Sequence, residues 1–192
     1  MSLQSERRKL DHRAIRALAH PLRLTLLELA SLEGSLTATR AAELTGESSA
    51  SCSFHLRQLA KYGFLEEAEG GTGRERPWRM RTLSHEWSDE GAEADVLEAL
   101  LVQRIGQQLT DWLQRRRREP AEWRRAAPGT YSLLYLTPDE LAAFGEELMR
   151  LGLPYIERHT DPSKRPEGAR PVRFVAAAFP LPAQGDVDKT PE

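Results

Sequence analysis

The chain has 192 residues, of which 40% are hydrophobic, and a formal net charge of −2. This length allows one large domain or two small ones with a packed core, and no stretch reaches the roughly 18 to 20 uninterrupted apolar residues of a membrane span. The N-terminus is polar and lacks the apolar segment of a signal peptide, and the single cysteine, Cys52, excludes an intramolecular disulfide. We therefore expect a cytoplasmic protein without membrane contact.

Three helices are expected before residue 47. Apolar residues recur at helical spacing over 9–19 and 21–32, and Pro21 suits the first turn of the second of these helices. The segment from Ser35 to Thr39 offers N-cap residues for a third helix, which ends at Gly46.

A fourth helix is expected from its N-cap, Ser48, to about Tyr62, with Gly63 as its terminator. Its apolar face must pack inward and consists of Cys52, Leu56 and Leu59. The opposite face is small near the start and cationic near the end, and consists of Ala50, Ser53, Phe54, Arg57 and Lys61. A short helix, a tight turn and a second helix that starts with hydroxyl residues form the geometry that enters a DNA major groove.

A basic β-hairpin is expected next. Residues 64–67 and 78–81 are typical of two strands, and the glycines of 70–73 allow the turn between them. The run 74–81 carries four arginines against one acid, whereas 84–98 carries six acids and no Lys or Arg. Because the basic charge is concentrated in one run, the net charge of −2 does not exclude a nucleic-acid partner.

A long helix over 92–126 is expected after the hairpin. One stripe of it is apolar and consists of Leu97, Leu101, Ile105, Leu109 and Trp112. Such a stripe needs a partner, and a second copy of the chain is the simplest one, so we expect a homodimer.

The remaining chain predicts a small α+β module over 127–180 and a disordered tail over 181–192. Residues 131–136 and 171–179 are typical of buried strands, and the helix between them begins at the capping sequence Thr137-Pro-Asp-Glu140 and ends near Leu151. This module would extend the dimer or hold a small-molecule effector. The predicted fold class is therefore mainly α with a small β part (α+β), with a winged helix-turn-helix domain at 9–83, a dimerisation helix at 92–126 and this C-terminal module.

An ordered set of motifs resembles the ArsR-like winged helix-turn-helix regulators. The motifs are Ala19-His-Pro-Leu-Arg23, Ala42-Glu-Leu-Thr-Gly46, Ser53-Phe-His-Leu-Arg-Gln-Leu59, Gly63-Phe-Leu and Gly73-Arg-Glu-Arg-Pro-Trp78. They cover about 10–83 and look closest to the actinobacterial-type members. The resemblance implies a homodimeric DNA-binding transcriptional regulator whose recognition helix spans about 48–62, and it favours repression over activation.

The sequence departs from the metal-sensing members of that family. Their Cys-x-Cys pair is missing from the third helix, and 92–118 contains no His. A soft metal needs several thiolate or imidazole ligands, so we expect neither a metal nor another cofactor. Cys52 is interpreted as a buried structural thiol and not as a redox sensor.

The candidate DNA contacts lie on the fourth helix and the hairpin. For His55, groove contact and a hydrogen-bonded packing role both remain open, and for Phe54, contact with a thymine methyl competes with packing against the wing. The run 115–118 is interpreted as a solvated helix end, where cations are favoured. The full set of candidates is Ser48, Ser49, Ser51, Ser53, Phe54, His55, Arg57, Gln58, Lys61, Arg74, Arg76 and Arg79.

The sequence therefore predicts a homodimeric regulator, and most simply a repressor, that binds double-stranded DNA at a pseudo-palindromic operator. The alternative is a winged-helix protein–protein interaction module or scaffold subunit. An enzyme is not expected, because no phosphate-binding glycine loop, no Ser/His/Asp arrangement and no paired carboxylates are recognised.

Overall fold

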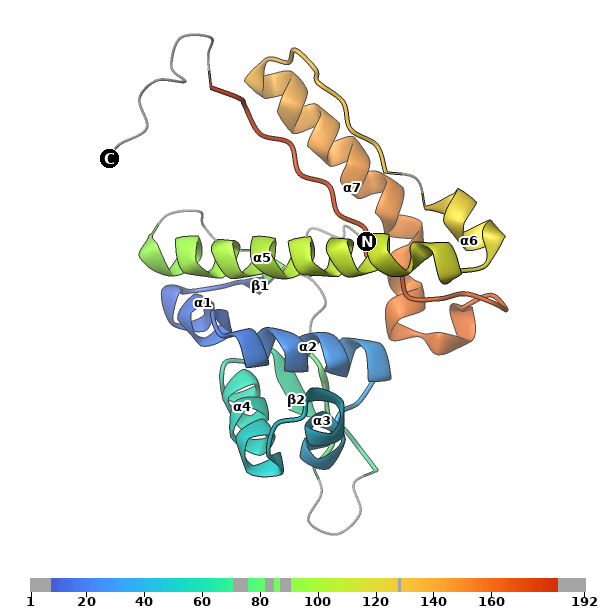
Figure 1. Ribbon diagram of the computed structural model, residues 1–192. Coiled ribbons are helices and arrows are strands. Elements are labelled where there is room, and N and C mark those ends of the chain that lie inside the picture. The colour runs from blue at the N-terminus through green and yellow to red at the C-terminus, as the bar shows by residue number, and fades with distance from the viewer. Residues whose placement is uncertain (1–7, 71–75, 82–84, 87–90, 128, 183–192) are drawn as a thin grey trace. The chain divides into compact units, whose positions relative to one another are not determined.

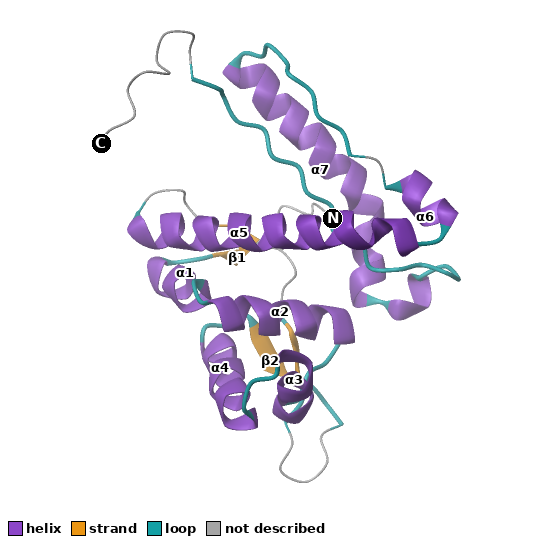
Figure 2. Cartoon of the chain, viewed as in Figure 1, coloured by secondary structure: helices purple, strands orange, loops and turns teal. Residues whose placement is uncertain are grey.

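The computed structural model of the protein is mainly helical with a small antiparallel sheet of two strands, consistent with the α+β class (Figure 2). The chain divides into two compact units, residues 1–128 (unit 1) and 129–192 (unit 2). The structure describes residues 8–70, 76–81, 85–86, 91–127 and 129–182.

Unit 1 contains most of the regular elements (Figure 1). In chain order they are β1 (Arg8–Lys9), α1 (His12–Leu18), α2 (Pro21–Glu33), α3 (Ala38–Thr45), α4 (Ser49–Lys61), β2 (Leu65–Glu67), β3 (Trp78–Met80), β4 (His85–Glu86), α5 (Ala92–Arg115), the 3-10 helix η2 (Arg116–Arg118) and α6 (Ala121–Ala126).

The helix starts follow from their caps. Thr37 and Ser48 cap α3 and α4, each accepting a hydrogen bond from the backbone N–H three residues on, which satisfies a donor that the first turn leaves unpaired. The start of the first helix was predicted wrongly at residue 9. It begins after Asp11, whose side chain accepts from the N–H of Ala14, because the preceding Arg8–Lys9 is extended and pairs with β4.

The hairpin is antiparallel and is extended by one residue from the loop after α2. β2 and β3 pair with Glu66 opposite Arg79, and Leu36 bridges to Trp78 through hydrogen bonds in both directions. The predicted order over 9–83, four helices followed by a pair of antiparallel strands, is thus present in the described residues. β1 and β4 form a separate parallel pair, which the sequence pattern did not predict.

The core of unit 1 joins the helices to the hairpin. Its fully buried side chains come from α2, the loop after it, α3, α4, the hairpin and α5, which shows that α5 belongs to this packed unit and is not an appendage. Burial of that many aliphatic groups is the main stabilising contribution to the unit. The most deeply buried large residues are Leu26, Leu36, Cys52, Leu56, Leu59, Phe64, Leu65 and Leu97.

The long helix predicted over 92–126 is wrong in its length. α5 ends at Arg115, η2 follows, and α6 begins only at Ala121. The break lies at Glu119, which is extended (φ −75°, ψ 152°), because the residue before a proline is disfavoured in the helical region and Pro120 has no N–H to continue the ladder.

Unit 2 consists of α7 (Pro138–Thr160), the 3-10 helix η3 (Pro162–Lys164) and two extended segments. The predicted start of α7 is confirmed, with the capping box of Thr137 and Glu140 formed in both directions. Its predicted end at Leu151 is wrong, because the helix continues through Pro154 to Thr160. Pro154 removes one backbone hydrogen bond, and its exposed position lets water hydrate the carbonyl that loses its partner.

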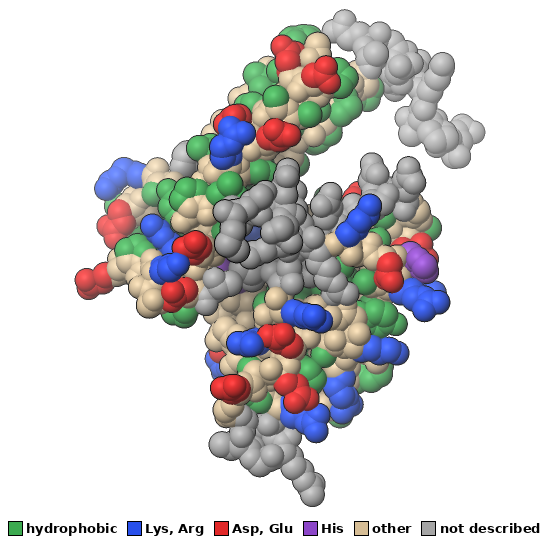
Figure 3. Space-filling view, turned by 180° about the vertical axis from the view of Figure 1, so that it is seen from behind, with side chains coloured by type: hydrophobic (Ala, Val, Ile, Leu, Met, Phe, Trp, Pro, Cys, Tyr) green, Lys and Arg blue, Asp and Glu red, His purple; other side chains and the backbone are tan. Residues whose placement is uncertain are grey.

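The two strands predicted at 131–136 and 171–179 do not form within the described part of unit 2. Both segments are extended chain without β pairing, so the module contains a helix but no strand there. Its apolar side chains are largely at the surface, and Figure 3 shows hydrophobic groups over α7. Of the tail predicted to be disordered, 183–192 lies outside the described residues.

None of the helices among the described residues has the length and apolar character needed to span a membrane.

Candidate nucleic-acid interface

α3 and α4 pack against each other across a three-residue turn, 46–48. Gly46 adopts the left-handed conformation (φ 76°) and donates its N–H to the carbonyl of Ala42 at 2.9 Å, a helix end that favours glycine. On the other side of the turn, the hydroxyl of Ser48 accepts from the N–H of Ser51 at 3.1 Å. The two caps fix where each helix stops and starts, and so form a helix-turn-helix arrangement.

The inner face of α4 is the one predicted from the sequence. Cys52, Leu56 and Leu59 are all completely buried, and the sulfur of Cys52 lies 3.7 Å from the hydroxyl of Thr45 on α3. Burial of this thiol fits the structural role and leaves it inaccessible to an oxidant.

The outer face of α4 is polar and cationic. Its first turn presents exposed hydroxyls, its middle presents Phe54 at 50% exposure, and its last two turns present Arg57 and Lys61. Of the other candidates on this helix, Ser51, Ser53, His55 and Gln58 are half-buried, whereas Ser48 and Ser49 are exposed. All nine candidates between 48 and 61 therefore remain at least partly accessible on one element.

A cluster of nitrogen-bearing side chains lies where α4 meets the start of α2. The ring centroids of His20 and His55 are 4.6 Å apart, and the rings of Phe54 and His55 form a T-shaped pair with centroids 5.1 Å apart. His20 also caps α2, because its Nδ1 accepts from the N–H of Leu22 at 3.2 Å. His55 thus packs on a second histidine.

The cluster favours neutral histidines. Burial lowers the pKa of His55, and the neighbouring His20 and Arg23 lower it further against the opposing pull of Glu47. Burial, followed by Arg23, lowers the pKa of His20 in the same direction. Nδ1 of His55 and Nε of Arg23 are buried and have no hydrogen-bond partner among the described residues. His55 packs against the rings of His20 and Phe54, and its contact with a DNA groove stays a prediction.

The motif 19–23 contains His20 and Arg23, but the sequence did not predict a function for either residue. The signal that could have found them is local, because the proline at the first helical position marks a helix N-terminus, and His20 and Arg23 lie within two residues of it. Their closeness to α4 depends on the packing of α2 against α4, which sequence spacing does not contain.

The hairpin is less basic than its sequence suggested. Arg79 donates through two nitrogens to one carboxylate oxygen of Glu66, at 2.9 and 2.8 Å, and Arg76 donates to Glu67 at 2.8 Å. These acids precede the arginine-rich run, and the antiparallel register places Glu66 directly opposite Arg79. Both ion pairs are exposed and therefore contribute little to stability, so a phosphate could replace either carboxylate. Arg74 lies outside the described residues.

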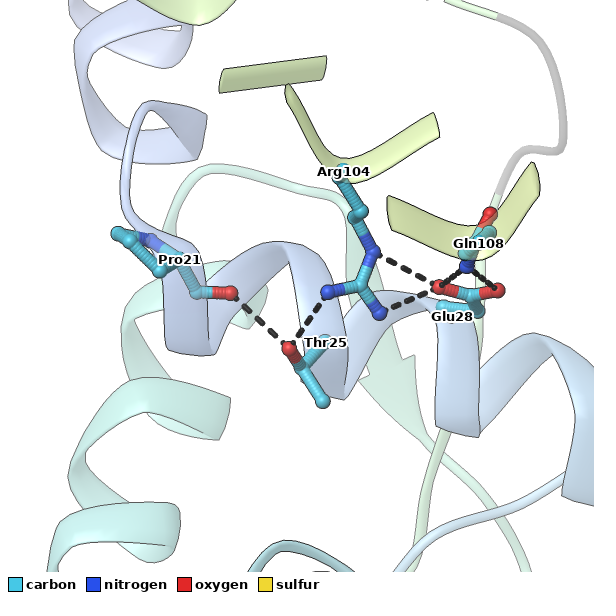
Figure 4. Close-up of polar contacts among 5 residues, drawn as sticks. All are labelled: Pro21, Thr25, Glu28, Arg104 and Gln108. Carbon is cyan, nitrogen blue, oxygen red and sulfur yellow. Dashed lines mark hydrogen bonds and ion pairs between the residues drawn. The ribbon is translucent and has the colours of Figure 1, made fainter. Parts of the chain in front are cut away.

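α4 is connected to α5 through α2. Arg104 of α5 donates to Glu28 from Nε at 2.9 Å and Nη2 at 2.5 Å, and to the hydroxyl of Thr25 from Nη1 at 2.9 Å. Gln108 donates to both oxygens of the same carboxylate, and Thr25 donates to the carbonyl of Pro21 (Figure 4). This half-buried network fixes α5 on α2, and α2 in turn packs on α4.

Part of the α5 stripe is covered within the chain, contrary to the expectation that the whole stripe faces a second copy. Leu97 is completely buried and Leu101 packs against the core of unit 1. Elsewhere α5 exposes apolar groups, among them Val96 at 53%, Val102 at 70% and Leu109 at 47%.

The run 115–118 fits the interpretation as a helix end. Arg115 donates to Glu119 at 2.6 Å and lies over the ring of Trp112, while the next three arginines form the exposed η2 turn.

No grouping of three or more His, Cys, Asp or Glu side chains suited to a metal ion occurs among the described residues. A scan of protein-family models and a search of curated proteins found no match to this chain.

Proposed function

We propose that this protein is a sequence-specific DNA-binding transcriptional regulator, acting as a homodimeric repressor on a pseudo-palindromic operator. The observation that carries the proposal is the capped α3–turn–α4 arrangement, whose second helix buries one apolar face and exposes a polar, cationic one. A helix of this kind can enter a major groove, with its first turns and Arg57 at the base edges and Lys61 near a phosphate.

The homodimer part of the proposal is supported by the uncovered apolar groups of α5. Two copies that joined through Val102 and Leu109 would each present one α4, because Arg104 holds α5 on α2. In this arrangement two recognition helices would meet successive major grooves about one helical turn apart.

The decisive experiment compares substitutions on the two faces of unit 1. Arg57→Ala and Ser53→Ala should weaken binding to the selected operator by about 1–3 kcal/mol per lost base contact and leave fold stability nearly unchanged. The matched control is Arg13→Ala, which removes an exposed cation of α1 and should change neither specific nor non-specific binding. An equal loss on operator and random DNA would show that Arg57 and Ser53 touch only the backbone.

A second experiment tests the wing. If Arg76 contacts a phosphate in each copy, Arg76→Ala should flatten the slope of log affinity against log salt by about 1.8, with similar losses on specific and random DNA. Glu67→Gln should steepen the slope or raise affinity for both DNAs, because it frees Arg76 from its carboxylate partner. An unchanged slope in both variants would mean that Arg76 does not contact phosphate, and the phosphate-contacting cations would then lie on α4 and in the 115–118 run.

The balanced charge of the described hairpin favours one other candidate function, a winged-helix protein–protein interaction module. That candidate predicts no binding to random DNA even at low salt, where phosphate contacts are strongest. Measurable low-salt binding that is lost in the Lys61→Ala, Arg57→Ala double variant would exclude it.

A further inference from the structure

Unit 2 presents two extended apolar segments that the described chain leaves open. In the first segment the side chains of Tyr131 and Tyr135 are 86% and 96% exposed, and in the second segment Phe174 and Phe179 are 68% and 70% exposed. Exposed aromatic rings on this scale are uncommon in a solitary soluble domain and mark a contact surface.

The backbone of the first segment is open as well. No backbone hydrogen bond joins 131–136 to any other part of the described chain, and neither this segment nor 171–179 takes part in the strand pairings found there. Their β-branched and aromatic residues favour strands, and an extended segment with unpaired N–H and C=O groups is a template for another strand.

The course of the chain keeps the two segments from meeting each other. In the view of Figure 1 one runs along each side of α7, and both run opposite to the direction of that helix. A strand–helix–strand connection of this kind leaves its two strands parallel, and a strand from elsewhere can be inserted between them or added at their edges.

We propose that 131–136 and 171–179 become β-strands by pairing with the same segments of a second copy of this chain. Residues 131–136 carry no charge and 171–179 only Arg173, so the surface offers no pattern for a charged partner, whereas a second copy brings the same apolar groups and the open backbone of 131–136. When like segments pair about a two-fold axis, the backbone N–H and C=O groups of both copies gain partners at once.

The exposed area is large enough for such an interface. At about 200 Å² per ring, the four aromatic residues alone expose on the order of 600 Å², against the roughly 800 Å² per partner of a stable interface. Leu133 at 69% and Val172 at 71% exposure add to that surface. The inference deepens the homodimer of the proposed function and rests on it only for the presence of a second copy.

The test is hydrogen exchange of the full chain at high and low protein concentration, with sedimentation measured on the same samples. In the associated state the amides of 131–136 and 171–179 should be protected, and protection should fall by at least about tenfold when the copies dissociate. Leu134→Pro removes a donor from the strand and should abolish this protection, whereas the control Leu134→Val keeps the N–H and the strand propensity and should retain it. Protection of α4 amides in both variants verifies that unit 1 remains folded.

Two results would overturn the inference. Protection that survives dissociation would show that the segments pair within one chain, and an associated state with fast-exchanging segments would assign association to α5 alone. A separate result would contradict the proposed function alone: a chain whose two segments are protected but which does not bind DNA.

Discussion

The two units differ in how their apolar residues are used. Unit 1 buries leucines from α2, α4 and α5 together with Phe64 against one another, and its helix ends are capped. Unit 2 has an equally well-capped helix in α7, yet the described part of this unit contains no buried residue. Local signals are thus sufficient to form a helix in either unit, whereas a core requires segments that close on one another. The contacts within unit 1 therefore supply a core, and the pairing with a second copy that we propose would supply contacts that unit 2 lacks by itself.

The largest effect should come from matched leucine truncations in two helices. Leu26→Ala in α2, where the side chain is completely buried, should cost about 2–5 kcal/mol of unfolding free energy, because it removes apolar contacts and leaves a cavity. Leu151→Ala in α7, where the side chain is 70% exposed, should cost no more than about 0.5 kcal/mol. All four tryptophans precede residue 128, so denaturant unfolding followed by tryptophan fluorescence reports unit 1, and hydrogen exchange reports α7. An equal loss of unfolding free energy in both variants would contradict the difference between the buried core of unit 1 and the exposed α7.

A smaller effect should separate the ion pairs of the two units. Arg104→Met leaves the half-buried carboxylate of Glu28 without its guanidinium and should cost about 1–3 kcal/mol. Arg150→Met removes the exposed pair with Glu147 on α7 and should change stability by less than about 0.5 kcal/mol. If Arg104 also positions α5 for DNA binding, Arg104→Met should alter the preferred operator half-site spacing, which a loss of stability alone would not do.

Glycine substitutions should act in opposite directions in the two units. Gly46→Ala should destabilise unit 1 by about 1 kcal/mol, since a Cβ is strained at φ 76° although the space around it is open. Gly152→Ala within α7 meets no neighbour and should stabilise that helix by up to about 1 kcal/mol. Thermal unfolding followed by circular dichroism checks both. A stabilised Gly46→Ala protein would contradict the turn geometry.

The smallest effect should be the pH dependence of unit 1. Burial lowers the pKa of both His20 and His55, so below about pH 6.5 the unfolded chain takes up protons that the native histidines resist. The free energy of unfolding should therefore decrease as pH falls from neutral through that value, and His55→Gln should weaken the dependence. Fluorescence-detected unfolding across this pH range measures it, and a stability that rises on acidification would contradict the neutral histidine pair.

Sequence by itself determined the features that depend on a few neighbouring residues. The helix starts at Thr37, Ser48 and Thr137 and the stop at Gly46 follow from local hydrogen bonds, and the inner face of α4 follows from helical spacing. Each needs no information beyond one helical turn or one helical face. The sequence predicted Ser48, Thr137, Gly46 and the inner face of α4 individually, and it placed the cap of α3 within the range from Ser35 to Thr39.

Only the tertiary structure decided which groups meet across the chain. The pairing of Arg79 with Glu66 depends on hairpin register, the stacking of His20 on His55 on the packing of α2 with α4, and the burial of Leu97 on the position of α5. Residues 131–136 and 171–179 have strand-forming sequences, but a strand also needs hydrogen-bonding partners, and the described chain supplies none for the first of them. Composition and spacing specify the propensity of a segment, whereas the identity of its partner is a property of the assembled fold.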